Sequence, residues 1–179
     1  MGRRARQGAS WGGGAFIPLP LINLIKDVNR LEDIVGIANG CNIPEDLYYL
    51  VDKHVWVRYE SDSLITIGIT DVAQHMAGKI IAVSPKKVGR ALTKGQSAGT
   101  VESGKWVGPV QVPVGGELVA VNDALKTNPG LINQDPYGAG WIVKLKPLNW
   151  AEDSKDLVTG DQGVAEYQQS LNDKGMSCV

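Results

Sequence analysis

The stretch TVESGKWVGP, residues 100–109, places one lysine, Lys105, between a glycine and a tryptophan in otherwise β-forming sequence. The β-prone segments on both sides predict two strands, and Ser103-Gly104 supplies the permissive backbone that a hairpin tip requires. We therefore expect Lys105 at or beside the tip, in water, where a modifying enzyme can enclose it without touching the core. A lone lysine is usually only a solvated side chain, so the rest of the sequence must decide whether this one carries chemistry.

Short stretches with strand character surround this hairpin on both sides. Ser61, Asp62 and Ser63 separate the first two and predict a hairpin there. Short helices are expected at 71–78, capped by Asp71, and at 123–133, broken at Pro129, with a C-terminal helix at 163–173. Many short strands divided by turn residues predict a mainly β (α+β) fold, a small barrel or sandwich with helical additions. The predicted strands are 54–60, 64–70, 79–84, 97–103, 105–113, 116–122 and 140–147.

The N-terminal part of the chain has a different pattern from the strands that follow. Residues 1–15 are rich in glycine and arginine without periodicity, which predicts a flexible arm. Apolar residues at helical spacing over 21–38 predict an amphipathic helix. Proline and acidic residues just ahead of apolar ones at 42–53 predict a short helical turn or connector. We therefore expect four segments, which are a flexible arm (1–15), an N-terminal helical extension (16–51), the main domain (52–173) and a flexible tail (174–179).

Composition excludes several classes of function. A formal net charge of -1 and 6% aromatic residues provide neither the basic field nor the stacking side chains of a nucleic-acid-binding protein. The longest apolar run, 16–25, is too short to span a bilayer and is broken by Pro18 and Pro20. Arg3-Arg4 resembles a twin-arginine signal, but no long apolar region follows closely, so we expect a cytoplasmic protein.

Neither a metal site nor catalytic residues are indicated by the sequence. Cys41 and Cys178 lie far apart without a CxxC pattern, which favours two free thiols in a reducing compartment over a disulfide framework. His54 and His75 are the only other soft ligands, and no Ser/His/Asp set is evident. We expect no active site of its own.

Five blocks of the sequence resemble, in order, the glycine cleavage H proteins, a family of lipoyl carriers. The resemblance covers residues 52–171 and implies a barrel-sandwich hybrid fold, as in lipoyl domains. In the family, the VESVKA segment carries the lipoyl group on its lysine. The matching blocks are HVWVR (54–58), TIGITDVAQ (66–74), VESGKW (101–106), PVGGELVAVNDAL (113–125) and NPGLINQDPYGAGWIVKLKP (128–147).

This resemblance implies that Lys105 carries a covalent lipoate. It also implies that Glu102 and Gly116 are read by the enzyme that attaches the group, a lipoate-protein ligase, and that dihydrolipoamide dehydrogenase is a possible partner. Gly104 and Trp106 flank the lysine where biotin carriers have methionine, which favours lipoyl. The protein is then a carrier and not an enzyme. Cys41 is interpreted as a buried structural thiol rather than as a partner in exchange with the lipoyl sulfurs.

Departures from the family surround the expected arm. Lys53, Val55 and Pro109 stand where H proteins have a serine and two carboxylates that hold the charged amine of the loaded arm. An ammonium cargo would lack its pairing there. Trp106 either shields the arm or packs on the barrel.

The segments ESGKWVGPV (102–110) and NGCNIPEDLYYL (39–50) also resemble the lipoate-binding proteins of sulfur oxidisers. That resemblance implies a carrier of sulfur-bound intermediates and electrons for a heterodisulfide-reductase-like complex in cytoplasmic sulfur oxidation. One alternative is an H protein that carries the aminomethyl group in glycine cleavage. The other is a non-lipoylated adaptor with the same fold.

Overall fold

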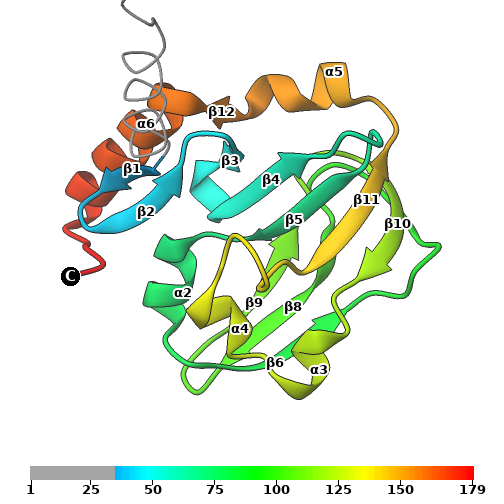
Figure 1. The fold of residues 1–179 in the computed structure, drawn as a ribbon, viewed down its shortest axis with the longest axis horizontal. Helices are drawn as coiled ribbons and strands as arrows, with labels where there is room; N and C mark the ends of the chain where they lie inside the picture. Colours follow the sequence, from blue (N-terminus) through cyan, green and yellow to red (C-terminus); the bar gives the residue numbers. More distant parts are fainter. Residues whose placement is uncertain (1–34) are drawn as a thin grey trace, which may run out of the picture. The chain divides into compact units, whose positions relative to one another are not determined.

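Two antiparallel sheets enclose the main core in the computed structural model, which describes residues 35–179 (Figure 1). The larger sheet has the strand order β12-β3-β4-β5-β11-β10-β7, and the smaller has the order β6-β8-β9. The strands of the larger sheet are β3 (Tyr48–Leu50), β4 (Val55–Tyr59), β5 (Ile65–Ile69), β7 (Ala91–Leu92), β10 (Gly116–Val121), β11 (Val143–Pro147) and β12 (Val158–Thr159). Those of the smaller sheet are β6 (Ile80–Pro85), β8 (Ser97–Ser103) and β9 (Val107–Gln111).

The hairpin of β4 and β5 lies near the centre of the larger sheet and forms as its sequence predicts. Val57 pairs with Ile67, and Trp56 pairs with Gly68. A Cβ on Gly68 would lie 2.6 Å from the Trp56 indole, so only glycine leaves room for this buried ring. The indole N–H donates to the carbonyls of Ile69 and Pro136 at 3.1 and 2.9 Å, which satisfies its polar atom inside the core.

The helices are short except for the last one. The predicted helix after β5 is α2, but its N-cap is Thr70, whose hydroxyl accepts from the Ala73 amide at 3.3 Å. Asp71, the predicted cap, instead accepts from the Asn42 amide at 2.8 Å. The helical elements are α2 (Asp71–Ala77), α3 (Ala124–Thr127), α4 (Leu131–Gln134), α5 (Trp150–Asp153), α6 (Gly160–Lys174) and the 3-10 turns η1 (Val51–Lys53) and η2 (Ser154–Asp156).

The helical extension predicted before residue 52 is wrong for the residues that the structure describes, which form strands. Residues 35–50 contain β3 and the hairpin of β1 (Val35–Ala38) and β2 (Cys41–Pro44), and only η1 is helical. The helix predicted over 21–38 is therefore wrong at its end, while its first part and the predicted arm lie outside the described residues. This hairpin packs on α6 around a second core, which explains the pattern, because buried strands and amphipathic helices both show recurring apolar residues.

The two cysteines are joined in a disulfide, Cys41–Cys178, contrary to the predicted free thiols. The tail predicted to be flexible at 174–179 is held as well, because the Cys178 amide donates to the Asn39 carbonyl at 3.0 Å. Helix α6 brings the tail back to β1 and β2 across a sequence separation of 137 residues. Such a return depends on tertiary packing, and no local spacing of cysteines signals it.

The predicted mainly β fold with short helices and a C-terminal helix is confirmed for residues 35–179. The break at Pro129 is also present, since α3 and α4 flank it. In this part of the chain no helix is both long and apolar enough to cross a membrane.

Candidate functional site

Lys105 lies at the exposed tip of the hairpin between β8 and β9, where the sequence predicts it. The tip is closed by a hydrogen bond from the Ser103 amide to the Trp106 carbonyl at 2.8 Å. The Ser103 hydroxyl also accepts from the Lys105 amide at 3.4 Å. Gly104 has open space around it. The lysine is thus displayed by a closed turn.

The lysine side chain passes over the C-terminal end of α2. A Cβ built on Gly78, the residue that ends this helix, would lie 3.5 Å from Lys105 Cε and 3.9 Å from Nζ. Within residues 35–179, Lys105 has no ion-pair partner. An unpaired ammonium at a hairpin tip is accessible to an enzyme that acylates it.

A largely apolar cavity of about 320 Å³ opens beside the lysine, and we call it the arm cavity. Among its described lining residues there is no carboxylate, and its charged groups are the ammoniums of Lys53 and Lys105. Its lining residues are Lys53, His54, Ile69, Ala73, Met76, Ala77, Lys105, Trp106 and Pro109.

Three of the four residues predicted to surround the arm do line this cavity, namely Lys53, Trp106 and Pro109. Val55 does not, because it is buried in the core with 1% of its surface exposed. Sequence reasoning missed Met76 and the other lining residues of α2. Met76 is 47% exposed on a short helix that borders the same cavity as the hairpin tip. Its sequence position marks it as a site residue only once the packing of α2 beside the hairpin is known.

Trp106 is held over its own strand. A Cβ on Gly108 would lie 1.7 Å from the Trp106 ring, so the indole covers the face of this glycine. The ring remains 46% exposed and forms one wall of the arm cavity. Both predicted roles of Trp106 are therefore compatible with its position, since it packs on the sheet and also borders the space beside the lysine.

His54 lines the arm cavity as a neutral side chain. Burial lowers its pKa from 6.5 to about 4, with a further lowering by Lys174 that Asp52 opposes. Its Nδ1 is buried and has no hydrogen-bond partner in the described residues, so protonation there would bury an unpaired N–H. His54 also has a positive φ of 53° and stacks on Tyr167.

The two residues expected to be read during modification are placed differently. Glu102 is exposed on β8, beside the tip. Gly116 is buried in β10 of the other sheet, where a Cβ would lie 2.4 Å from the Lys146 carbonyl oxygen. This close approach of two strands is a structural reason for glycine at position 116. Its part in recognition stays a prediction.

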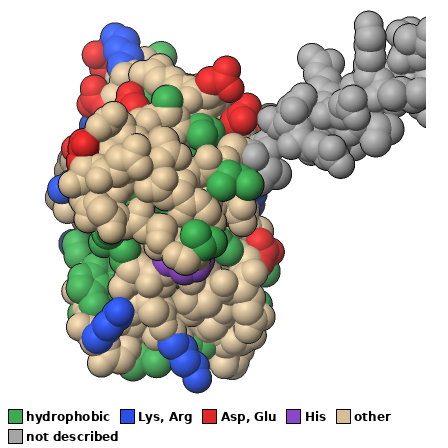
Figure 2. All heavy atoms as spheres, turned by 90° about the vertical axis from the view of Figure 1, so that its left-hand side faces the viewer, with side chains coloured by type: hydrophobic (Ala, Val, Ile, Leu, Met, Phe, Trp, Pro, Cys, Tyr) green, Lys and Arg blue, Asp and Glu red, His purple; other side chains and the backbone are tan. Residues whose placement is uncertain are grey.

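Lys105 also borders a second cavity of about 440 Å³, which we call the cystine cavity because both cysteines line it. Figure 2 shows a histidine exposed on this side of the molecule, with hydrophobic side chains around it and basic side chains below.

In residues 35–179 the one group of possible metal ligands is Asp71, His75 and Cys178. Because the Cys178 sulfur is bonded to Cys41, this group presents no thiolate to a metal.

Comparisons with known proteins agree on one family. The family described as "Glycine cleavage H-protein" matches residues 47–170. The chain is 51% identical over 145 residues to glycine cleavage system H protein 5 of Aquifex aeolicus, covering 79% of this chain and 97% of that protein. It is 44% identical over 143 residues to a probable glycine cleavage system H protein 2 of Sulfurisphaera tokodaii, covering 79% and 96%.

A solved structure has the same fold. The crystal structure of a glycine cleavage system H protein from Mycobacterium marinum is similar with a TM-score of 0.62 and 33% sequence identity. The match covers 75% of this chain and all of that one. The family match over residues 47–170 contains the β8–β9 hairpin and every residue that lines the arm cavity, whereas Cys41 and residues 171–178 of the cystine cavity lie outside it.

Proposed function

Because the chain belongs to the glycine cleavage H-protein family, we propose that Lys105 is the residue that carries its covalent lipoyl group. Proteins of this family are carriers without catalytic activity that bear a lipoyl-lysine. The observation that supports Lys105 is its place at an exposed hairpin tip, free of ion pairs with the described residues and next to an apolar cavity.

The surroundings of Lys105 fit the group. A lipoyl arm has an aliphatic chain and a ring with two sulfurs, and the arm cavity offers apolar walls from Ile69, Ala73 and Met76. When bound, the group supplies a dithiol that takes up a cargo or two electrons and passes them on. The tether raises the local concentration of that dithiol at each partner enzyme, while the protein itself only presents it.

We further propose that a lipoate-protein ligase recognises Glu102 beside the tip. Glu102 is exposed and pairs with Val107 in the register of the hairpin, so an enzyme that encloses Lys105 meets it directly. Dihydrolipoamide dehydrogenase is the partner expected to reoxidise the arm. We also propose that the protein acts in the cytoplasm. The two-sheet fold is proposed to be a barrel-sandwich hybrid, as in lipoyl domains.

The first candidate cargo is the aminomethyl group of glycine cleavage. The names of the relatives support it, since those from Aquifex aeolicus, Sulfurisphaera tokodaii and Chromobacterium violaceum are all glycine cleavage H proteins. The arm cavity opposes it, because an ammonium cargo would find Lys53 and no carboxylate in the described lining.

The second candidate cargo is sulfur, handed to a heterodisulfide-reductase-like complex. It rests on the charge of the arm cavity alone, where Lys53 and the neutral His54 would tolerate an anionic or neutral cargo once lipoylation has turned the Lys105 ammonium into an amide. No name among the relatives supports this reading, so the aminomethyl cargo has the stronger backing from the comparisons.

The carrier proposal is tested by intact mass. Expressed with a lipoate-protein ligase, the wild-type chain is expected to gain the mass of one lipoyl group. Lys105→Arg is expected to abolish this gain, while Lys87→Arg, a matched change at an exposed lysine, leaves it intact. A chain that stays unmodified, or one modified equally in both variants, would contradict the proposal and leave the non-lipoylated adaptor.

The cargo is tested by loading the lipoylated protein with glycine decarboxylase. If charge in the arm cavity decides, loading with methylamine is poor in the wild type and improves in the double variant Lys53→Ser, Pro109→Asp, which removes a cation and adds a carboxylate. Efficient loading of the wild type would establish the glycine cleavage cargo and remove the argument for sulfur.

A further inference from the structure

The cystine cavity brings a disulfide and the proposed lipoyl lysine together. Lys105 lines one side, and Cys41 and Cys178 line another. Its lining residues are Cys41, Val72, His75, Met76, Lys105, Leu171, Gly175, Met176, Ser177 and Cys178. A group attached to Lys105 therefore has an open path to these sulfurs over the surface of α2.

The two sulfurs of this disulfide differ in access. Cys41 belongs to β2 and is fully buried, whereas Cys178 near the C-terminus is half-buried. A thiol that enters the cavity therefore meets Cys178 first, and Cys41 is the leaving sulfur. The rate of thiol–disulfide exchange depends on which sulfur is attacked and on how accessible that sulfur is, so exposure favours attack at Cys178.

The tail that carries Cys178 is held by more than the disulfide. The Asn39 side-chain amide donates to the Met176 carbonyl at 3.0 Å, and the Cys178 amide donates to the Asn39 carbonyl at 3.0 Å. Asn39 is in turn bonded to Gln168 of α6. Opening the disulfide leaves these bonds in place, so the two cysteines stay close enough to rejoin.

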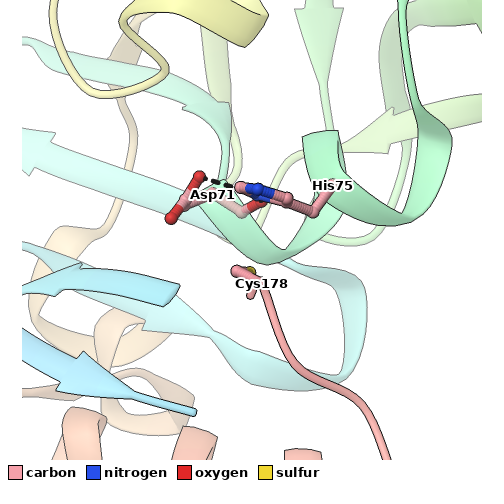
Figure 3. Close-up of side chains that lie close together, drawn as sticks. All are labelled: Asp71, His75 and Cys178. Carbon is pink, nitrogen blue, oxygen red and sulfur yellow. Dashed lines mark hydrogen bonds and ion pairs between the residues drawn. The ribbon is translucent and has the colours of Figure 1, made fainter. Parts of the chain in front are cut away.

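An imidazole and a carboxylate lie beside the Cys178 sulfur (Figure 3). His75 and Asp71 come from adjacent turns of α2, with Nδ1 3.1 Å from Oδ1, and their ligand atoms and the Cys178 sulfur lie within 4.8 Å of one another. Asp71 is fixed by the Asn42 amide and by Tyr137, whose hydroxyl accepts from the Asp71 amide at 3.0 Å. The His75 imidazole is thus held close to a sulfur, and imidazole is the side chain suited to proton exchange near neutral pH.

We propose that the Cys41–Cys178 disulfide exchanges two electrons with the lipoyl arm of its own chain, an inference that rests on Lys105 carrying that arm. In the reducing direction the Cys41–Cys178 bond breaks and the S–S bond of the lipoyl ring closes. The dithiol of the arm is oxidised, the cystine is reduced, and the two thiol protons of the arm pass to the cysteine sulfurs. His75 takes the proton of the attacking thiol and returns it to a cysteine thiolate.

This exchange needs no further reactant, and its reverse regenerates the disulfide. Intramolecular contact favours it, because the tether keeps the arm at high effective concentration near the cystine cavity. In a reducing cytoplasm, where the proposed function places the protein, disulfides that occur are usually transient and redox-active rather than structural. The pair would then store two electrons between encounters of the arm with its partners.

The test follows the cysteines themselves, not the turnover of a partner. The lipoylated protein is reduced with lipoamide dehydrogenase and excess NADH, quenched with an alkylating agent, and digested, and the alkylated cysteines are measured by mass spectrometry. We expect Cys41 and Cys178 to become alkylated together, with a rate constant that does not change on dilution. Lys105→Arg, which carries no arm, is the control in which both cysteines stay in the disulfide.

A second variant probes the proton transfer. His75→Asn keeps a polar side chain on α2, and we expect it to slow the exchange about tenfold while the arm itself is reduced at the wild-type rate. The proposal is overturned if the arm becomes fully reduced while the disulfide persists, or if the cysteines are reduced as fast in Lys105→Arg. Intact mass reports lipoylation separately, so a failed exchange is distinguishable from a failed carrier proposal.

Discussion

Stability of the fold should depend on the protonation of His54 in a defined pH window. Burial lowers the pKa of His54 from 6.5 to about 4 in the folded chain. Between these values the unfolded chain binds a proton at this imidazole and the folded chain does not. The free energy of unfolding therefore falls as the pH falls from about 6.5 to about 4, and His54 adds no further loss below that.

The size of this loss follows from the shift. At about 1.36 kcal/mol per pKa unit, a lowering from 6.5 to about 4 corresponds to about 3 kcal/mol. Because His54 is only partly buried, solvent screening reduces this, and we expect about 2 kcal/mol. The physical cause is local, since Nδ1 has no partner in the described residues and Lys174 repels a charge there.

The assay is urea unfolding at several pH values between 7.5 and 4, with His54→Asn as the matched variant. Asparagine tolerates the positive φ of 53° at this position and does not titrate. Carboxylates that titrate in the same window affect both proteins equally, so the difference between their pH profiles isolates the imidazole. Identical profiles for the two proteins would refute the reasoning, whatever their absolute stabilities.

Two other substitutions test the packing around the site, each by urea unfolding. Gly116→Ala should destabilise the fold by about 1–3 kcal/mol, because its Cβ would lie 2.4 Å from the Lys146 carbonyl oxygen. Unchanged stability would show that β10 and β11 can move apart at no cost in free energy. Asn133→Ala should lower the free energy of unfolding by about 1–3 kcal/mol, because this side chain donates to Gln74 Oε1 at 2.8 Å and to the Gly78 carbonyl at 3.0 Å. A variant as stable as wild type would mean that water replaces both hydrogen bonds.

Each candidate cargo makes a different demand on the arm cavity. A methylamine-loaded arm carries an ammonium that needs a carboxylate when it leaves water, whereas a sulfur-bound cargo is neutral or anionic. Lys53 and Pro109 stand at the rim of the cavity, so changes there alter charge without disturbing the core. Val55, which is buried, is a poor site for the same experiment because a carboxylate there would be placed inside the core.

The exposed lysine and most of the fold could be predicted from the sequence. Alternation of apolar residues in 54–60 and 64–70 and the three residues between them predict a hairpin, which the structure confirms as β4 and β5. The β8–β9 tip at Lys105 follows from equally local signals, since Ser103-Gly104 permits the turn. These features depend on interactions between residues close in the chain, and such interactions leave a readable pattern.

Other features were decided only by tertiary structure. The strands of residues 35–50 have the same apolar content as a helix, and their pairing and contact with α6 selected the extended form. Cys41 and Cys178 meet because α6 returns the tail to β2, and that same return brings the tail to the cavity that His75 and Lys105 also line. A contact between residues 137 positions apart leaves no local periodicity or spacing in the chain, so only the packed fold reveals it.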